Sequence, residues 1–271
     1  MGEQSDQRRA AQANGHHSER SDADLDAAKG AALDEFRQRT LRRGVNPVVY
    51  WVARALLVPF FLVYFRLERI GRDHIPRSGP LLLAANHRSF LDPFVIGACA
   101  RRPVYYMAKR ELFEKRWQAW VLGSLGAFPV DRGASDQDAM ATARAILARG
   151  DCVVIFPEGT RVRGGPLGDA RRGVGRLALE TGTRVVPIAV IGSDHVRKGW
   201  RIRPRKVRIR CGRPLAYPTV QQPSPALAAG VANRIWACIS LQWQWLGGAT
   251  AAGERLDRPR KGAPREVQRA A

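Results

Sequence analysis

The chain has 271 residues, enough for one large α/β domain or two small ones with a sizeable core. Hydrophobic residues make up 45% of it, which excludes a chain that is disordered throughout. The formal net charge of +21 indicates a polyanionic partner, such as nucleic acid, an anionic membrane or a phosphorylated substrate. Residues 47–250 hold thirty-one basic and thirteen acidic side chains, so the excess lies in the body of the chain.

The N-terminal region has two parts of different composition. Residues 1–46 are polar with balanced charge and contain little to bury, so we expect a disordered leader with a helical pattern over residues 24–43. Residues 48–65 are apolar but barely long enough to span a bilayer, and Arg54 and Pro59 interrupt them. Basic residues flank this run on both sides, which favours a helix lying in the membrane interface. We therefore predict a membrane-associated helical segment over residues 47–72, although a buried core helix also fits its length.

After this segment, strand and helix patterns alternate. Short apolar runs between turn signals predict strands at residues 79–86, 103–108, 152–156, 185–192 and 207–211. Helices are predicted at 135–149 and 173–181, and another begins at Asp92-Pro93, with Asp92 as its N-cap. The order predicts an α/β fold with a mostly parallel sheet flanked by helices, over residues 73–250. Residues 251–271 are expected to be a flexible tail.

The cysteines and the first residues limit the chemistry. Cys99, Cys152, Cys211 and Cys238 follow no metal-binding spacing, so we expect buried thiols in a reducing compartment and neither a zinc site nor a cofactor. The first apolar run begins behind the long polar leader, so no secretory signal peptide is expected.

The segment NHRSFLDP, residues 86–93, places His87 and Asp92 at a strand end, a loop and a helix start. An alcohol that attacks an activated acyl group must lose its proton, and an imidazole oriented by a carboxylate is a suitable base. Taken alone, the pattern also fits a helix cap at Asp92 and a polar loop residue at His87, because short patterns recur by chance.

A second segment, FPEGTR at residues 156–161, directly follows a predicted buried strand. Backbone N–H groups, a threonine hydroxyl and a guanidinium can converge there on a phosphate. Ligands of parallel α/β sheets bind beyond the carboxyl ends of strands, where both segments fall. As a bare string, the segment could also be a simple turn.

The blocks NHRSFLDP, AKREL, GAFPVDR, FPEGTR and VVPIAV occur in this order between residues 76 and 214, and in this they resemble the lysophospholipid acyltransferase family. The 1-acylglycerol-3-phosphate acyltransferases are its typical bacterial members. The resemblance implies a general base with its carboxylate partner (His87 and Asp92), two groups that hold the acceptor phosphate (Lys109 and Arg161), and residues that shape the glycerol-phosphate pocket (Gly126, Arg132, Glu158, Gly159 and Thr160). It also implies a place for Pro187 near the acyl-donor channel.

The resemblance implies a transfer of a fatty acyl group from acyl-CoA or acyl carrier protein to the sn-2 hydroxyl of 1-acylglycerol-3-phosphate, which gives phosphatidic acid. Glycerol-3-phosphate, a lyso-ornithine lipid or another lysolipid are alternative acceptors. A departure at residues 113–120, FEKRWQAW, leaves the acyl-chain preference open. The leader and the tail have no counterpart in the family pattern.

Two other classes of protein fit part of the sequence. The charge alone fits a nucleic-acid-binding protein, but no known binding motif supports it, so no nucleic-acid partner is expected. A membrane-surface scaffold is disfavoured by the intact blocks. Nine basic residues between 196 and 213 fit an anionic membrane surface or a solvated strand face. Trp236, Trp243 and Trp245 fit core packing or the interface. We expect a monotopic or peripheral protein on the cytoplasmic face of the cell membrane.

Overall fold

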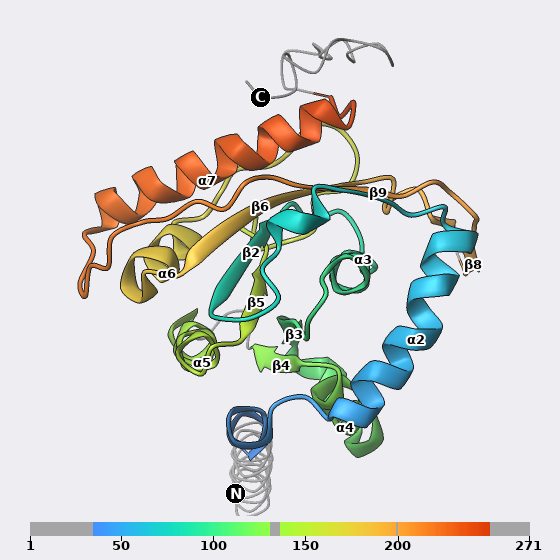
Figure 1. Ribbon diagram of the computed structural model, residues 1–271, viewed down its shortest axis with the longest axis horizontal. Helices are drawn as coiled ribbons and strands as arrows, with labels where there is room; N and C mark the ends of the chain where they lie inside the picture. Colours follow the sequence, from blue (N-terminus) through green and yellow to red (C-terminus); the bar gives the residue numbers. More distant parts are fainter. Residues whose placement is uncertain (1–34, 131–135, 199, 250–271) are drawn as a thin grey trace, which may run out of the picture.

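The computed structural model describes residues 35–130, 136–198 and 200–249 (Figure 1). Seven strands form one sheet in the order β1-β9-β6-β2-β5-β3-β4. Their bounds are β1 Glu68–Ile70, β2 Leu81–Ala85, β3 Tyr105–Lys109, β4 Ala127–Val130, β5 Cys152–Ile155, β6 Arg184–Ile191 and β9 Arg208–Cys211. Within the described residues, every pairing in this sheet is parallel except that of β6 with β9. The predicted mostly parallel α/β fold is therefore confirmed.

Helices cover both faces of the sheet (Figure 1). α5 Asp136–Ala148, α6 Gly173–Thr181 and α7 Pro225–Trp245 lie on one face, and α3 Asp92–Cys99 lies on the other with α2 Pro47–Tyr64 and α4 Arg116–Ser124. The central strand β2 explains why both faces need cover. Leu82 and Ala84 belong to the core cluster of α5, α6 and α7, whereas Leu81 and Leu83 belong to the cluster of α2 and α3. Because successive side chains of a strand alternate, a fully apolar strand buries both faces.

No sequence pattern predicts the strands β1 and β4 of the main sheet or the helix α4. β1 has three residues, two of them charged, and β4 contains Pro129, so neither carries a normal strand pattern. α4, together with the 3₁₀ turn η2 Arg110–Phe113, occupies the segment where the chain departs from the family pattern. Beside the main sheet, β7 Arg197–Lys198 and β8 Arg201–Ile202 pair as a short hairpin.

The last part of the predicted leader is helical and contacts the domain. Residues 35–43 are helical, within the range where the sequence shows a helical pattern. The Phe36 ring lies 6.2 Å from that of Phe113, and Arg149 donates to the carbonyl oxygens of Thr40 and Leu41. These contacts anchor this helix to the domain. Residues 1–34 and the predicted tail lie outside the described residues.

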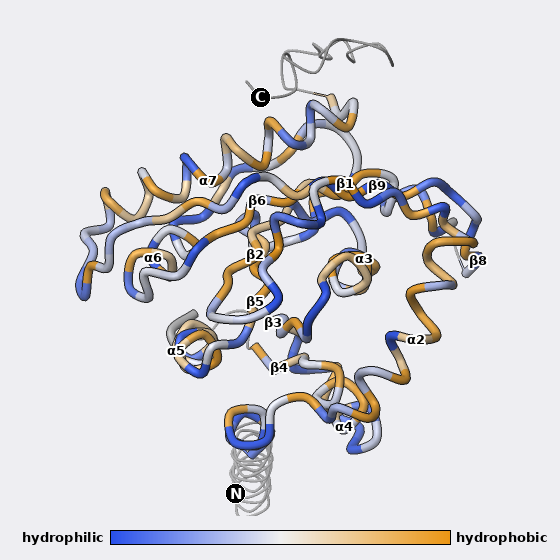
Figure 2. The backbone as a smooth tube through the Cα atoms, in the orientation of Figure 1, coloured by the Kyte–Doolittle hydropathy of each residue, from blue (hydrophilic) through white to orange (hydrophobic). Residues whose placement is uncertain are grey.

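α2 is long and apolar enough to cross a membrane, judged by length and composition alone. Figure 2 shows mainly apolar residues along its length. One side of α2 packs on α3 and α4, while the other is exposed; Leu56 and Val63 are 70% and 79% exposed. The exposed large apolar residues form one stripe along the helix (Val48, Trp51, Val52, Leu56, Phe60 and Val63). We call this set the α2 stripe.

Arg54, which interrupts the apolar sequence of α2, binds the end of α3. The last carbonyl groups of a helix have no partner within it, and this end of α3 is buried. Three arginines supply the donors: Arg54 from α2, Arg69 from β1, and Arg72 from the turn η1 Arg72–His74. Together they donate to four successive carbonyl groups (Gly97, Ala98, Cys99 and Ala100). Their positive charge also complements the helix dipole, so α3 is fixed at the end opposite Asp92.

Candidate active site

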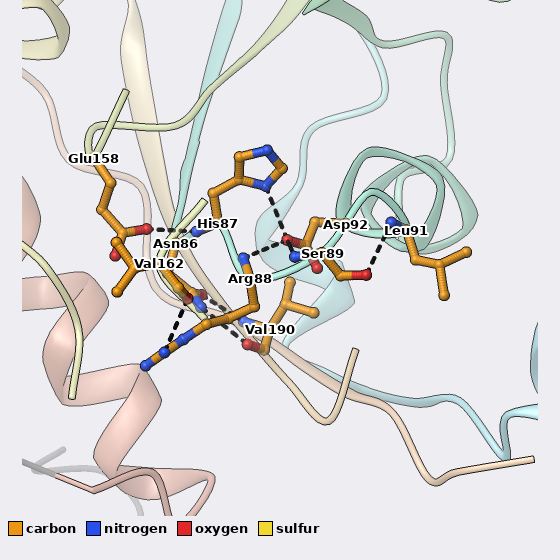
Figure 3. A network of polar contacts seen from close by, with 9 residues as sticks. All are labelled: Asn86, His87, Arg88, Ser89, Leu91, Asp92, Glu158, Val162 and Val190. Carbon is orange, nitrogen blue, oxygen red and sulfur yellow. Dashed lines mark hydrogen bonds and ion pairs between the residues drawn. The ribbon is translucent and has the colours of Figure 1, made fainter. Parts of the chain in front are cut away.

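The turn from β2 to α3 holds His87 and Asp92 together (Figure 3). His87 follows the carboxyl end of β2, and Asp92 is the first residue of α3. The Nδ1 atom of His87 lies 2.9 Å from Oδ2 of Asp92. Asp92 is fully buried and His87 is 6% exposed. The side chains that the sequence separates by five positions therefore meet.

Asp92 does not cap α3, which corrects the sequence prediction. Leu91 occupies the N-cap position and makes no capping bond with its side chain. Instead, the carboxylate of Asp92 turns back to the loop, where Oδ2 also accepts the backbone N–H groups of Arg88 and Ser89 at 2.6 and 2.7 Å. Three donors on one oxygen fix the carboxylate against His87. The pattern Asp-Pro predicts the helix start correctly but does not reveal this orientation.

The imidazole of His87 is held on its flat side by Phe156. The two ring centroids lie 4.0 Å apart, with an angle of 19° between the ring planes. A neutral imidazole that donates from Nδ1 to a carboxylate keeps a lone pair on Nε2. In Figure 3, this second ring nitrogen points away from Asp92 and from the other labelled residues. The arrangement can therefore accept a proton at Nε2.

Glu158 cross-links the His87 turn to the loop that follows β5. Its Oε2 atom accepts the backbone N–H of His87 at 2.6 Å, and its Oε1 atom accepts that of Gly168 at 3.0 Å. Burial raises the pKa of the Glu158 carboxyl, while these two N–H groups oppose the rise. Both carboxylate oxygens bond to the protein backbone, so Glu158 holds the His87 turn and the loop after β5 together. This differs from the implied role of Glu158 in the substrate pocket.

Arg88 is a second cross-link, which the sequence analysis did not single out. Its side chain is only 1% exposed, and its guanidinium lies 4.6 Å from the ring centre of Trp243 in α7. The two Nη atoms donate to four carbonyl oxygens of the loop after FPEGTR (those of Val162, Gly164, Gly165 and Pro166). Asn86 similarly ties the turn to β6, because its side-chain amide bonds both backbone groups of Val190. The partners of Arg88 and Asn86 are distant in sequence, so no local sequence pattern indicates these contacts.

The residues expected to hold phosphate lie along one edge of the sheet. β2, β5 and β3 are neighbours in the sheet, and their carboxyl ends lead to His87, to the loop of residues 156–161 and to Lys109. Lys109, Thr160 and Arg161 are all exposed. Their exposure leaves them accessible to a charged ligand at this edge.

Gly159 adopts a left-handed conformation with φ of 69°. A Cβ atom there would lie 2.7 Å from Nε of Arg171, so the Arg171 side chain packs against this bare backbone. Arg171 is thus a further basic group beside the FPEGTR loop. No local pattern indicates its position, because it lies ten residues beyond Arg161.

Two implied assignments find no support in the geometry, and one lies outside the described residues. Gly126 precedes β4 and therefore lies at the amino edge of the sheet, opposite His87; its φ of 91° and the nearby carbonyl of Val104 explain the glycine. Pro187 is buried within β6, where it pairs with Ala84 of β2. Arg132 lies outside the described residues.

The site residues fall within a segment that matches known proteins. Residues 66–191 match the model of the family described as Acyltransferase. A 1-acyl-sn-glycerol-3-phosphate acyltransferase of Bacillus subtilis is 30% identical over 147 residues, which cover 54% of this chain and 71% of that protein. The chain belongs to the acyltransferase family. The family resemblance of the sequence blocks is therefore confirmed.

Other relatives have similar names but match over less of their length. A chloroplastic 1-acyl-sn-glycerol-3-phosphate acyltransferase of Arabidopsis thaliana is 29% identical over 136 residues, or 49% of this chain and 38% of that one. A Borreliella burgdorferi protein of the same name is 28% identical, with 56% of its length covered. The chain thus spans less than two thirds of these relatives.

The crystal structure of the 1-acyl-sn-glycerophosphate acyltransferase PlsC of Thermotoga maritima has a TM-score of 0.50 to this chain. It is 19% identical, and the match covers 79% of this chain and 82% of that one. At this identity, the likeness supports the family fold.

Proposed function

We propose that this member of the acyltransferase family is a 1-acylglycerol-3-phosphate O-acyltransferase. It transfers a fatty acyl group from acyl-CoA or acyl carrier protein to the sn-2 hydroxyl of its acceptor, which gives phosphatidic acid. The observation that carries the proposal is the contact between His87 and Asp92 at the carboxyl edge of the sheet. The names of the relatives support the choice of substrate.

His87 acts as the general base. Its Nε2 atom takes the proton of the acceptor hydroxyl while the hydroxyl oxygen attacks the carbonyl carbon of the thioester. A carbon–oxygen bond forms, the carbon–sulfur bond breaks, and the proton passes from His87 to the departing sulfur. No nucleophile from the protein is required, because the thioester is already an activated acyl donor.

Asp92 orients the base and stabilises its charged form. Its carboxylate accepts from Nδ1, which selects the tautomer with a free lone pair at Nε2. When His87 takes up the proton, the buried carboxylate lies beside the new positive charge. The backbone donors of Arg88 and Ser89 keep Asp92 in place during this change.

Lys109 and Arg161 bind the phosphate of the acceptor, with Thr160 and the backbone of Gly159 as additional donors. A planar guanidinium can donate two parallel bonds to a phosphate, and an ammonium adds a compact charge. Arg171 adds a further positive charge beside Gly159. Arg132 is assigned to the same pocket from the family resemblance.

The protein docks on an anionic membrane at the cytoplasmic face through the α2 stripe. The stripe runs along one side of α2 while the other side packs on the domain, as expected for a helix that lies in the interface. The exposed Trp117 and Trp120 of α4 and Trp200 beside β8 add amphipathic rings. The short hairpin β7–β8 supplies basic groups for anionic headgroups.

One assay tests the reaction and separates the acceptors. Purified protein receives labelled acyl-CoA or acyl carrier protein with lysophosphatidate, glycerol-3-phosphate, a lyso-ornithine lipid or a neutral lysolipid, and the products are resolved by chromatography. We expect labelled phosphatidic acid from lysophosphatidate, and at least ~10²-fold slower formation with the His87→Ala protein. A labelled product from another acceptor alone would replace the proposed substrate, and no product from any would contradict the activity.

A further inference from the structure

A concave surface lies at the end of the sheet opposite to His87. This cavity of about 240 Å³ is bounded by helix 35–43, the start of α2 and the end of α4. It adjoins the amino end of β3, where the hydroxyl of Tyr105 accepts the N–H of Val45 at 2.9 Å. His87 lies beyond the carboxyl end of β2, which runs in the same direction. The cavity is therefore separate from the proposed reaction site.

Two arginines line this cavity, which we call the Arg39/Arg43 cavity. They are four residues apart in helix 35–43, so they lie on the same face, where like charges repel each other. Neither forms an ion pair with any residue in the part of the chain that the structure describes, whereas Arg37 of the same helix pairs with Asp138. A bound anion would relieve this repulsion and join both guanidiniums.

Buried polar groups complete the wall. Thr40 and Ser124 line the cavity and are 4% and 8% exposed. The Thr40 hydroxyl donates to the carbonyl oxygen of Phe36, but the Ser124 hydroxyl has no hydrogen-bond partner among residues 35–130, 136–198 and 200–249. It is therefore available to a ligand. The start of α2 also lies at this wall, and a helix N-terminus favours negative charge.

The position of the cavity indicates which anion it binds. The α2 stripe begins at Val48, next to the lining residue Pro47, and the half-exposed Trp120 lines the cavity as well. If the stripe lies in the membrane interface, the cavity opens at the level of the lipid headgroups. We propose that the Arg39/Arg43 cavity binds the phosphate group of an anionic phospholipid headgroup. This inference rests on the membrane docking proposed above and adds a lipid site separate from the acceptor site.

Two adjacent arginines provide a matched test. Arg42 has the same charge and lies in the same helical turn as Arg43, but it does not line the cavity. The full-length protein is mixed with phosphatidylcholine vesicles, with or without one quarter phosphatidylglycerol and without lysolipid. Arg42→Gln should weaken binding to the anionic vesicles by about five-fold through diffuse attraction. Arg43→Gln should weaken it about fifty-fold, because direct bonds to the phosphate contribute a further factor of about ten.

A second pair of variants leaves the charge unchanged. Gly123 of α4 lines the cavity, and a Cβ atom there would meet no atom within 4 Å. Gly123→Leu fills the cavity and should weaken binding to the anionic vesicles about ten-fold. Gly123→Ala should bind nearly as wild type. Thermal unfolding curves confirm that each variant is folded.

Several outcomes would overturn the inference. Equal losses for Arg42→Gln and Arg43→Gln, or wild-type binding by Gly123→Leu, would mean that diffuse charge alone attracts the membrane. Stabilisation of the vesicle-free protein by inorganic phosphate, lost in Arg43→Gln, would assign the cavity to a soluble anion. Equal binding of wild type to neutral and anionic vesicles would refute the lipid site alone, whereas no binding to either would also refute the proposed membrane docking.

Discussion

One carboxylate oxygen of Asp92, Oδ2, contacts the imidazole of His87 and accepts the backbone N–H groups of Arg88 and Ser89. The loop from His87 to Asp92 thus closes on itself around Oδ2. Its other oxygen, Oδ1, is buried and has no hydrogen-bond partner in the part of the chain that the structure describes. The same carboxylate therefore shapes the loop and contacts the proposed base, and substitutions must separate these two roles.

The first prediction concerns the base itself. His87→Ala removes the proton acceptor, and we expect the rate of acyl transfer to fall at least ~10²-fold. The fold should persist, because the backbone N–H of His87 still bonds to Glu158. Turnover is measured with lysophosphatidate and acyl-CoA, and unfolding is followed by circular dichroism. Activity within a few-fold of wild type would contradict the mechanism.

The second prediction separates the charge of Asp92 from its shape. In Asp92→Asn, the amide oxygen can take the place of Oδ2 and keep its three donors, while the NH₂ group takes the place of Oδ1. The loop should therefore remain, but no carboxylate stabilises the charged imidazole, so we expect turnover to fall ~10²-fold or more. The acceptor KM should change little, because the phosphate groups are untouched. An Asn variant with wild-type turnover would show that the charge of Asp92 is not needed.

Much of this site could be predicted from the sequence because local signals and the sheet order agree. The strand ends at residues 86 and 156 follow apolar runs, and parallel strands bring their carboxyl ends to one edge. What escaped prediction depends on distant backbone groups. From the sequence alone, Arg88 is expected to be an ordinary surface arginine. In the structure, the loop of residues 162–166 covers it and accepts its hydrogen bonds. The sequence places Glu158 in the substrate pocket, whereas in the structure it accepts the backbone N–H groups of His87 and Gly168.

The same limit applies to the fold. The apolar runs at residues 79–86 and 185–192 predict strands correctly, because these central strands are apolar on both faces. β1 and β4 are the outermost strands of the sheet, and an outermost strand need not be apolar on both faces. Arg54 looked like an interruption of an apolar helix, and only the position of α3 reveals its partners.

The third prediction uses the raised pKa of the Glu158 carboxyl, which results first from its burial. The folded protein binds this proton more tightly than the unfolded chain, so the stabilisation is complete below the ordinary glutamate pKa of about 4. It is lost as the pH rises towards the raised value. Glu158→Gln cannot ionise and has one oxygen for two N–H donors, so it should be less stable than wild type. That difference should shrink as the pH rises from about 4, measured by denaturant unfolding; a constant difference would contradict the prediction.

The fourth prediction tests the α2 stripe. Val52 and Leu56 are exposed neighbours on it, and each apolar side chain that enters lipid contributes roughly 1.5–3 kcal/mol. The double variant Val52→Gln/Leu56→Gln should therefore bind neutral vesicles at least ~10-fold more weakly, with unchanged thermal stability. Leu227→Gln/Leu241→Gln is the control, since these residues are exposed on α7, across the sheet from α2. Equal binding by both double variants would exclude the stripe as the membrane contact.

The last prediction concerns the phosphate of the acceptor and decides between acceptor classes. Arg161 is exposed at the end of the FPEGTR loop, whose backbone is joined to His87 through the N–H of Val162, at 2.9 Å from the His87 carbonyl oxygen. A guanidinium bonded to phosphate contributes roughly 1.5–3 kcal/mol. Arg161→Ala should therefore raise the KM for lysophosphatidate roughly ten-fold or more, and leave the KM for the acyl donor nearly unchanged.

Two controls make this result specific. Arg161→Lys keeps the charge but loses the planar fork, so its KM for lysophosphatidate should fall between those of wild type and Arg161→Ala. Arg184→Ala removes an exposed arginine at the amino end of β6, the opposite edge of the sheet, and should leave both KM values at wild type. If Arg161→Ala also kept the wild-type KM for lysophosphatidate, Arg161 would hold no acceptor phosphate, and a lyso-ornithine or neutral lysolipid would become the favoured acceptor.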